Sequence, residues 1–211
     1  MCGRYTLITD FSVILTEFHI QAIKGEYQPS DNVSPGQRVL TLIKKDDKNR
    51  LVSCRWGLIP AWAKDPTLGN KMFNARAETV ALKPSFRQAF HKRRCLIIAD
   101  GFYEWAKLAK QKIPYRFSLR TEAPFGLAGL YETWTDAENK AVTTCTIITT
   151  EANELTGPIH DRMPVIVPKD KEALWLDPGT KDQRELAAIL KPFPAEAMKM
   201  EEGFLRREPW K

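Results

Sequence analysis

Short strand-like runs joined by turns constrain the fold of this chain more than any other feature of its sequence. Apolar and β-branched residues are concentrated in the runs 38–43, 51–56, 95–105, 115–120, 125–134, 142–149 and 165–167. Polar tips and turn residues separate most neighbouring runs, which favours hairpins. Helical segments are interspersed without the regular alternation of parallel βαβ units. The sequence therefore predicts an α+β fold built on a mainly antiparallel, barrel-like β-sheet with flanking short helices.

Helical periodicity occurs only in short segments. The predicted helices span 10–20, 84–91, 150–155, 169–176 and 181–191. Asp10 is the expected N-cap of the first helix. The second helix has an apolar face made of Phe86, Ala89 and Phe90. Because a glycine interrupts the longest strand-like run at Asp100-Gly101, we expect a bulge or bend there.

The length and the apolar content suit one globular domain. The chain has 211 residues, of which 43% are hydrophobic. We assign residues 1–197 to this domain and 198–211 to a charged, weakly patterned C-terminal tail. The longest apolar runs are too short to cross a bilayer, and no basic segment with an apolar stretch opens the chain. We therefore expect a cytoplasmic monomer with no membrane partner.

The four cysteines argue against a metal site and a disulfide framework. They are widely separated, with no C-x-x-C pair, and histidines are not clustered near them. Cys54, Cys95 and Cys145 lie in strand-like runs, where a small buried side chain is the ordinary role. Only Cys2 falls outside that interpretation. We predict no metal and no cofactor.

The charge balance favours an anionic partner without establishing one. Thirty-two Lys and Arg against 26 Asp and Glu give a formal net charge of +6. Residues 83–94 contain five basic side chains and no acidic one. Such a run is either a solvated helix face or a surface that contacts phosphates, and the sequence leaves both interpretations open.

Cys2 is the residue with unusual chemical potential. The small side chain next to Met1 favours removal of the initiator methionine, which would leave a cysteine with a free α-amine. One amine and one thiol two carbons apart can attack the same aldehyde in succession. The amine forms an imine, and the thiol then closes it to a five-membered thiazolidine in an intramolecular step. A start with Met-Cys also arises by chance, so the rest of the chain has to supply a site.

Seven short motifs supply that site when they are taken together. They are Met-Cys-Gly-Arg-Tyr at 1–5, Asn-Val-Ser-Pro-Gly at 32–36, Trp-Gly-Leu-Ile-Pro-Ala-Trp at 56–62, Asn-Ala-Arg-Ala-Glu-Thr at 74–79, Pro-Ser-Phe-Arg at 84–87, Ala-Asp-Gly-Phe-Tyr-Glu-Trp at 99–105 and His-Asp-Arg-Met-Pro at 160–164. Their order and spacing resemble those of the SOS-response-associated peptidase (SRAP) family. The resemblance runs from residue 2 to about residue 168. The chain departs from the family near its end, because no Val-Asn pair follows Pro194.

The resemblance implies a protein of the DNA damage response that recognises abasic sites in single-stranded DNA. Such a protein cross-links to the lesion through its N-terminal cysteine and shields it. The implied catalytic residues are Cys2, Asn74, Glu104 and His160. The implied DNA-binding residues are Arg4, Pro35, Trp62, Arg76, Arg87, Thr149 and Arg162. His160 and Glu104 would move protons, Asn74 would position the amine or the sugar, the arginines would hold phosphates, and Trp62 would wedge against neighbouring bases.

Two other functions remain open on the sequence alone. The family label suggests a peptidase that uses Cys2 as its nucleophile, either on its own leader or on other proteins. The second is a protein that reads modified or single-stranded DNA without forming a bond. Because only Met1 precedes Cys2, an ordinary aminopeptidase explains processing, and a general protease is the weaker of the alternatives.

Overall fold

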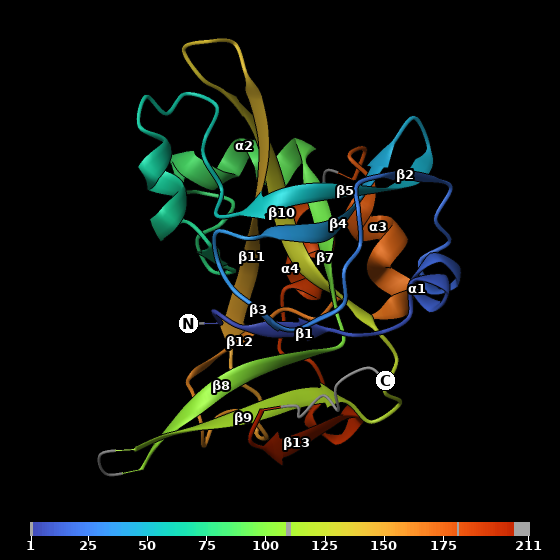
Figure 1. Ribbon diagram of the computed structural model, residues 1–211, viewed down its shortest axis with the longest axis vertical. Coiled ribbons are helices and arrows are strands. Elements are labelled where there is room, and N and C mark those ends of the chain that lie inside the picture. Colours follow the sequence, from blue (N-terminus) through green and yellow to red (C-terminus); the bar gives the residue numbers. More distant parts are fainter. Residues whose placement is uncertain (1, 109–110, 181, 205–211) are drawn as a thin grey trace.

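The computed structural model describes residues 2–108, 111–180 and 182–204. Five of its strands pair into a closed, barrel-like ring, which occupies the upper part of the molecule in Figure 1. These strands are β4 (Arg38–Lys45), β5 (Lys48–Trp56), β7 (Arg94–Ala99), β10 (Phe125–Thr135) and β11 (Ala141–Glu151). Pairing runs β11-β10-β7-β4-β5, and a parallel contact between β5 and β11 closes the ring. Most of the pairings in the two sheets are antiparallel. The predicted α+β class with a barrel-like, mainly antiparallel sheet is therefore confirmed.

A second sheet lies below the ring in Figure 1 and carries the beginning of the chain. Its order is β13-β9-β8-β1-β3, and every pairing in it is antiparallel. The strands are β1 (Tyr5–Leu7), β3 (Ser30–Val33), β8 (Gly101–Leu108), β9 (Gln111–Leu119) and β13 (Met198–Glu202). The β8–β9 hairpin projects from the lower left of the molecule in that view.

The predicted bend at Asp100 is where the chain passes from one sheet to the other. β7 belongs to the ring and β8 to the second sheet, although one apolar run encodes both. The Asp100 carboxylate accepts hydrogen bonds from the Thr6 hydroxyl at 2.6 Å and from the Ile8 and Thr9 amides at 2.6 and 2.9 Å. A Cβ at Gly101 would lie 2.6 Å from the Arg116 guanidinium, so a larger residue at this corner would have to displace the Arg116 side chain.

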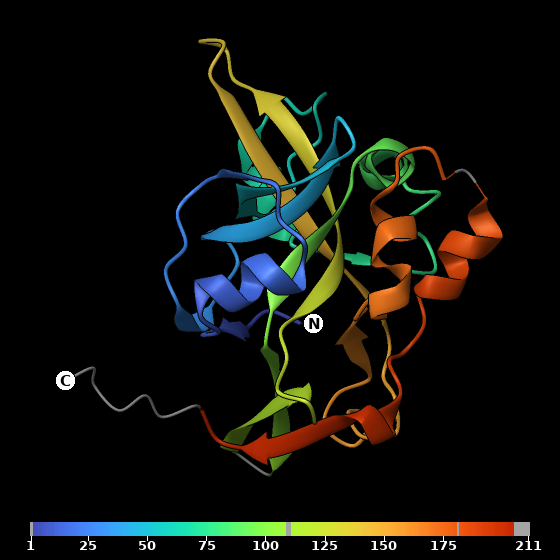
Figure 2. The same ribbon diagram turned by 90° about the vertical axis from the view of Figure 1, so that its right-hand side faces the viewer.

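Short elements cover the ring and extend its edges. The helices are α1 (Phe11–Glu17), α2 (Pro84–Lys92), α3 (Glu172–Leu176) and α4 (Gln183–Ile189), and the 3-10 turns are η1 (Pro66–Lys71), η2 (Lys169–Lys171) and η3 (Ala195–Ala197). The short strands are β2 (Ala22–Lys24), β6 (Asn74–Arg76) and β12 (Arg162–Pro164). Figure 2 shows α3 and α4 along one side of the ring. Among the described residues, the helices are all too short or too polar to span a membrane.

The core confirms the predicted apolar positions. Phe86, Ala89 and Phe90 are buried on α2. Cys54, Cys95 and Cys145 are fully buried free thiols inside the ring. The long apolar runs therefore serve mainly to fill the interior of the closed sheet.

Three local predictions need correction. The segment 150–155 is not a helix, because β11 continues to Glu151 and turns follow it. The strand predicted at 165–167 lies earlier, at β12, with only an isolated bridge between Leu127 and Ile166. Asp10 is the N-cap residue of α1, as predicted, although its side chain accepts no capping hydrogen bond.

The third correction concerns the segment assigned to the tail. Met198–Glu202 is strand β13, which pairs with β9 over five residues. Phe204 then packs on Tyr103 and Trp105, with ring centroids 5.1 and 6.3 Å apart. Ordered pairing therefore extends past the boundary drawn at residue 197. Residues 205–211 of the predicted tail lie outside the described part of the chain.

Glu172 gives the fold a testable pH dependence. Burial raises the pKa of this carboxyl to about 7, against the opposing attraction of Lys169, whose ammonium lies 3.2 Å away. The folded-state pKa exceeds the unfolded value of about 4.3, so the folded state binds the proton more tightly. The associated stability is present below about pH 4.3 and is lost as the pH rises through 7.

Glu172→Gln is therefore expected to stabilise the protein at pH 8 and to change little near pH 4. At about 1.4 kcal/mol per pKa unit, the gain is at most about 4 kcal/mol. Thermal unfolding at the two pH values measures it. The matched control is Asp170→Asn on the exposed face of η2, whose carboxylate lies beside Lys171. An equal shift in both variants, or a gain that is largest at low pH, would contradict the assignment.

Candidate functional site

Cys2 is placed beside strand β8 by the pairing of β1. Tyr5 pairs with Phe102 and Thr6 with Gly101, and the Tyr103 amide donates to the Arg4 carbonyl at 2.9 Å. Continued antiparallel pairing brings the start of the chain alongside Glu104 and its neighbours on β8. Cys2 is only 3% exposed. The pairing of β1 with β8 therefore places Cys2 in a buried position.

The Cys2 thiol contacts the Glu104 carboxyl, and each group changes the other's acidity. Burial raises the pKa of the Cys2 thiol well above its ordinary value, and the Glu104 carboxylate raises it further. Burial also raises the pKa of Glu104, which is 2% exposed, while the hydrogen bond from Cys2 partly opposes this. Oε1 of Glu104 is buried with no hydrogen-bond partner among the described residues. The pair therefore combines a protonated thiol with a carboxyl that can accept or donate a proton.

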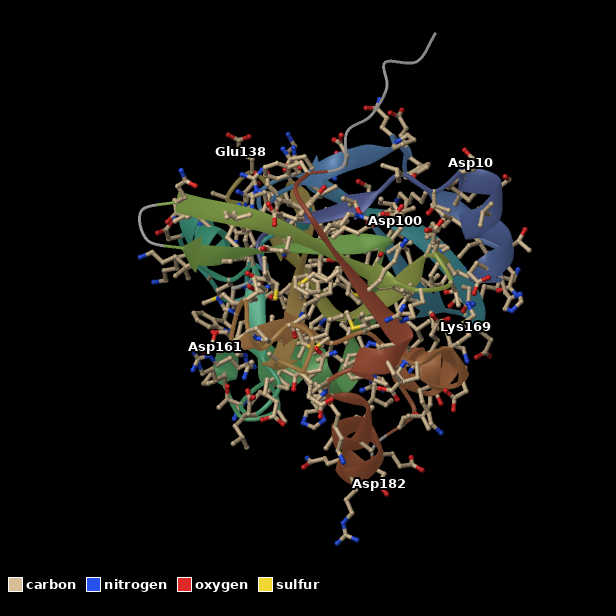
Figure 3. All side chains as sticks on the ribbon, turned by 90° about the horizontal axis from the view of Figure 1, so that it is seen from below. Asp10, Asp100, Glu138, Asp161, Lys169 and Asp182 are labelled. Carbon is tan, nitrogen blue, oxygen red and sulfur yellow. The ribbon has the colours of Figure 1, made fainter. Side chains whose placement is uncertain are left out.

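His160 lies close enough to Glu104 for its charge to lower the pKa of that carboxyl, and both residues line the same cavity. Its Nδ1 accepts a hydrogen bond from the Arg162 amide at 3.0 Å, which places the proton of the neutral ring on Nε2. The Asp161 carboxylate lies 3.1 Å from the same Nδ1 and would pair with the protonated ring. Figure 3 shows Asp161 on the side of the molecule from which the β8–β9 hairpin projects. The Arg162 amide and the Asp161 carboxylate thus hold the imidazole in one orientation.

A cavity of about 370 Å³ opens next to this cluster. It is lined by Glu104, Trp105, Lys112 and His160. Clefts that hold small ligands begin at about 300 Å³. A larger depression of about 740 Å³ lies between β1, β3 and β4, where none of the predicted catalytic side chains line it. The chemistry is therefore concentrated at the smaller cavity.

Arg162 is part of the same cluster but is already ion-paired. Its guanidinium donates to both carboxylate oxygens of Glu78, at 2.6 and 3.1 Å, and to the Thr149 carbonyl at 2.6 Å. Its charge also lowers the pKa of the Cys2 thiol, as a smaller effect than burial and Glu104. Thr149 is 3% exposed, so its contribution is to hold Arg162. Arg162 and its partners Glu78 and Thr149 are therefore suited to holding the side chains of the site in position.

Asn74 and Arg76 reach the site region through strand β6. This strand pairs in parallel with the end of β11, so that Asn74 lies opposite Ile147 and Arg76 opposite Thr149. The Asn74 amide donates to the Phe73 carbonyl at 3.1 Å, while its buried Oδ1 has no partner among the described residues. Arg76 is exposed. β6 thus presents a hydrogen-bond acceptor and an accessible cation next to the residues that hold Arg162.

Trp62 stands out on the loop that follows β5. Its indole is 61% exposed, yet the next residue is anchored, because the Ala63 carbonyl accepts a hydrogen bond from the Trp134 indole at 2.7 Å. Gly57 has a φ of +134°, and a Cβ there would lie 2.5 Å from the Gly69 carbonyl oxygen. An apolar ring held outward on an anchored loop is suited to contact a planar ligand.

Three predicted DNA-binding residues lie on other elements. Arg4 precedes β1 and donates to the Asn32 side chain at 2.6 Å, Pro35 is in the turn before β4, and Arg87 is exposed on α2. The contacts described above for Cys2, Glu104 and His160 involve none of these three side chains. The structure thus brings Cys2, Glu104, His160 and Arg162 together, with β6 beside them, and leaves the remaining predicted residues around that centre.

Sequence analysis missed Lys112 as a wall of the cavity. It lies on β9, for which the apolar run indicated a start only at residue 115. A hairpin interpretation of 101–119 would have paired Lys112 with Lys107. Across the described ranges, no three His, Cys, Asp or Glu side chains are grouped so as to hold a metal ion.

Comparisons with known proteins agree on one family. Residues 1–202 match the family model described as SOS response associated peptidase (SRAP). The chain is 50% identical over 201 residues to the abasic site processing protein YoqW of Bacillus subtilis (strain 168), covering 94% of this chain and 90% of that protein. It is 31% identical over 202 residues to the abasic site processing protein HMCES of Gallus gallus, covering 80% of this chain and 60% of that protein.

Solved structures show the same architecture. A crystal structure of a Bacteroides thetaiotaomicron protein matches with a TM-score of 0.85 at 29% identity, covering 95% of this chain and 91% of that one. A Bordetella bronchiseptica protein matches with a TM-score of 0.83 at 26% identity, covering 97% of this chain and all of the other.

Proposed function

The chain belongs to the SOS response associated peptidase (SRAP) family, and on this premise we propose that it recognises abasic sites in single-stranded DNA and bonds to them through Cys2. The names of its relatives support a role in abasic-site processing. The covalent step is the part that the Cys2 cluster supports. We place this activity in the cytoplasm, at the nucleoid when the protein binds DNA, and assign it to the monomer.

The proposed reaction joins two groups of one residue to one aldehyde. After removal of Met1, the Cys2 amine adds to C1′ of the ring-opened sugar, and the carbinolamine loses water to give an imine. Sγ then adds to the same carbon while the thiol proton passes to nitrogen. One C–N and one C–S bond form, one water leaves, and nothing is oxidised or reduced.

Glu104 and His160 have distinct roles in this scheme. Glu104 touches the thiol, so it accepts the proton as Sγ attacks and returns it to nitrogen, and earlier it transfers protons between the amine and the carbinolamine hydroxyl. His160, in the charged form that pairs with Asp161, donates its Nε2 proton to the sugar ring oxygen during ring opening and is left as the neutral ring. The unpartnered Oδ1 of Asn74 accepts a hydrogen bond from the amine or from the sugar.

The DNA strand would be held around this centre. Arg76, Arg87 and Arg4 present cations for phosphates, and Trp62 with Pro35 supplies apolar contact to bases that flank the lesion. Arg162 acts mainly on the site itself, because Glu78 already pairs with it, and Thr149 keeps it in place.

The observation that carries the proposal is the carboxyl next to the thiol. A cysteine protease activates its nucleophile by lowering the thiol pKa with a neighbouring imidazole or another positive environment. Here burial and Glu104 raise the pKa of the Cys2 thiol, so it stays protonated until a strong electrophile is held beside it. An imine generated by the adjacent amine is such an electrophile. This favours aldehyde capture over peptide hydrolysis.

A free α-amine on Cys2 is the direct requirement of this chemistry. A variant with one uncleavable residue kept before Cys2 is expected to lose the heat- and detergent-resistant complex with an abasic oligonucleotide and to keep its fold. Denaturing gels with abasic and intact oligonucleotides measure the complex, and thermal unfolding checks the fold. A resistant complex formed equally by the extended variant would refute the amine's role. Casein cleavage that depends on Cys2 would support the peptidase instead.

Salt dependence tests the phosphate contacts. For single strands, the logarithm of the binding constant falls with the logarithm of salt by about 0.7 per phosphate neutralised. Arg76→Ala is expected to flatten the slope by about 0.7. The matched control is Arg50→Ala at the β4–β5 tip, where Arg50 pairs with Asp46 at 2.7 Å. Equal slopes for parent and Arg76→Ala would remove Arg76 from the interface.

A further inference from the structure

The β8–β9 hairpin supplies most of the wall of the cavity beside Cys2. Glu104 and Trp105 come from β8, and Lys112 comes from β9, while His160 lies on the loop before β12. Lys112 is exposed and pairs across the hairpin with Lys107. A cation thus stands at the edge of the space next to the reactive residues.

The charges around this cavity leave Lys112 available to an anion. Glu104 is buried, and the Arg162 guanidinium is neutralised by the bidentate pair with Glu78. Among the described residues, no carboxylate lies within ion-pairing distance of the Lys112 ammonium. A ligand phosphate that reaches this edge therefore meets a cation without displacing a protein carboxylate.

Strand β9, which carries Lys112, is held in place by its pairing with β8 and by aromatic contacts of Trp105. Trp105 pairs with Pro114 across the hairpin and lies 6.3 Å, centroid to centroid, from both Tyr103 and Phe204. β9 is also paired on its other edge with β13. The β13 pairing covers Tyr115–Leu119, and at Lys112 the sheet consists of the two hairpin strands, with Lys112 opposite Lys107. The backbone of Lys112 is thus paired on one edge, and its flexible side chain is the part that a ligand orders.

We propose that Lys112 binds the phosphodiester next to the sugar that occupies this cavity, and so orients the lesion toward Cys2. The proposal rests on the proposed function, because it takes the ligand to be an abasic strand. A sugar without a base leaves its flanking phosphates as the strongest handles on the lesion. A lysine at the cavity edge serves as a point-charge contact for one of them. Lys112 is then a positioning residue for the reaction at C1′.

The test uses binding without chemistry. The probe is a single-stranded oligonucleotide with one tetrahydrofuran abasic analogue, which has no aldehyde. Two further probes replace the phosphodiester on the 5′ or the 3′ side of the analogue by an uncharged methylphosphonate. Dissociation constants are measured for the parent, Lys112→Ala, Lys112→Arg and the matched control Lys48→Ala, an exposed lysine at the start of β5.

We expect Lys112→Ala to weaken binding of the charged probe about five- to tenfold. This effect lies between those of losing an exposed ion pair and losing a buried charged hydrogen bond. Lys112→Arg should restore binding, and Lys48→Ala should leave it unchanged. When the methylphosphonate replaces the phosphodiester that Lys112 contacts, Lys112→Ala should cause no further loss of affinity. Additive losses on both methylphosphonate probes, or equal losses for Lys112→Ala and Lys48→Ala, would overturn the proposal.

The same data separate this proposal from the one it rests on. If the parent prefers the abasic probe to an intact strand but the Lys112 losses are additive, only the role of Lys112 fails. If the parent binds neither probe, the proposed function fails and the role of Lys112 fails with it.

Discussion

Cys2→Ala is expected to abolish the heat-stable adduct with an abasic oligonucleotide while leaving an adduct that borohydride can trap. The methionine before alanine is still removed, so the α-amine survives and forms the imine. The thiol that would close the ring is absent, so the imine persists. An imine acidifies the neighbouring C2′ hydrogen, so the variant is also expected to nick the strand by eliminating the 3′ phosphate.

The measurement is a denaturing gel of an end-labelled abasic oligonucleotide, run with and without borohydride. The control is Cys54→Ala, which removes a fully buried thiol from the ring and leaves the Cys2 cluster intact. A heat-stable adduct formed by Cys2→Ala without reductant would identify another nucleophile. A variant with no trappable imine would show that the amine is not the attacking group.

The second large effect is expected from the two proton-transfer residues. Glu104→Gln and His160→Ala should each slow cross-linking about 10²- to 10⁴-fold, the usual cost of losing a general acid or base. The cross-linking rates of the two variants should depend differently on whether the substrate needs ring opening. An aldehyde that needs no ring opening should restore the rate of His160→Ala and leave Glu104→Gln slow, because only His160 is assigned to the ring oxygen. Single-turnover kinetics with both substrates measure this.

Stability provides the control for Glu104→Gln. Burial raises the pKa of Glu104, so the folded state holds its proton more tightly than the unfolded chain does. The related stability is present below about pH 4.3 and declines as the pH rises toward the raised pKa. Glutamine removes this loss, so the variant is expected to be at least as stable as the parent at pH 7.5. A slow variant that has also lost stability would point to a structural role for Glu104.

The ring was predictable because its information is local. Alternating apolar runs with turns between them indicate hairpins, and Asp100-Gly101 marked the corner between β7 and β8. The limits of strands were less accessible. β13 is an edge strand with three exposed residues, so its sequence lacks the apolar alternation by which a half-buried strand is recognised.

The site could be predicted only through the resemblance of its motifs. Cys2 meets Glu104 because β1 pairs with β8, and no local pattern in either segment specifies that long-range pairing. The sequence also did not show which of the predicted cations are already ion-paired. Arg162 reads as an ordinary surface cation until the structure shows both Glu78 oxygens engaged with it. Lys112 was missed because the hairpin continues into polar residues that carry no strand signal.

Intact mass after mixing the purified protein with an abasic oligonucleotide tests the central claim most directly. The account predicts a species equal to the protein without Met1, plus the oligonucleotide, minus one water, and stable to heat without reductant. An intact-strand control should give no such species. Unchanged protein and oligonucleotide masses, when the two bind under the same conditions, would contradict covalent capture by Cys2.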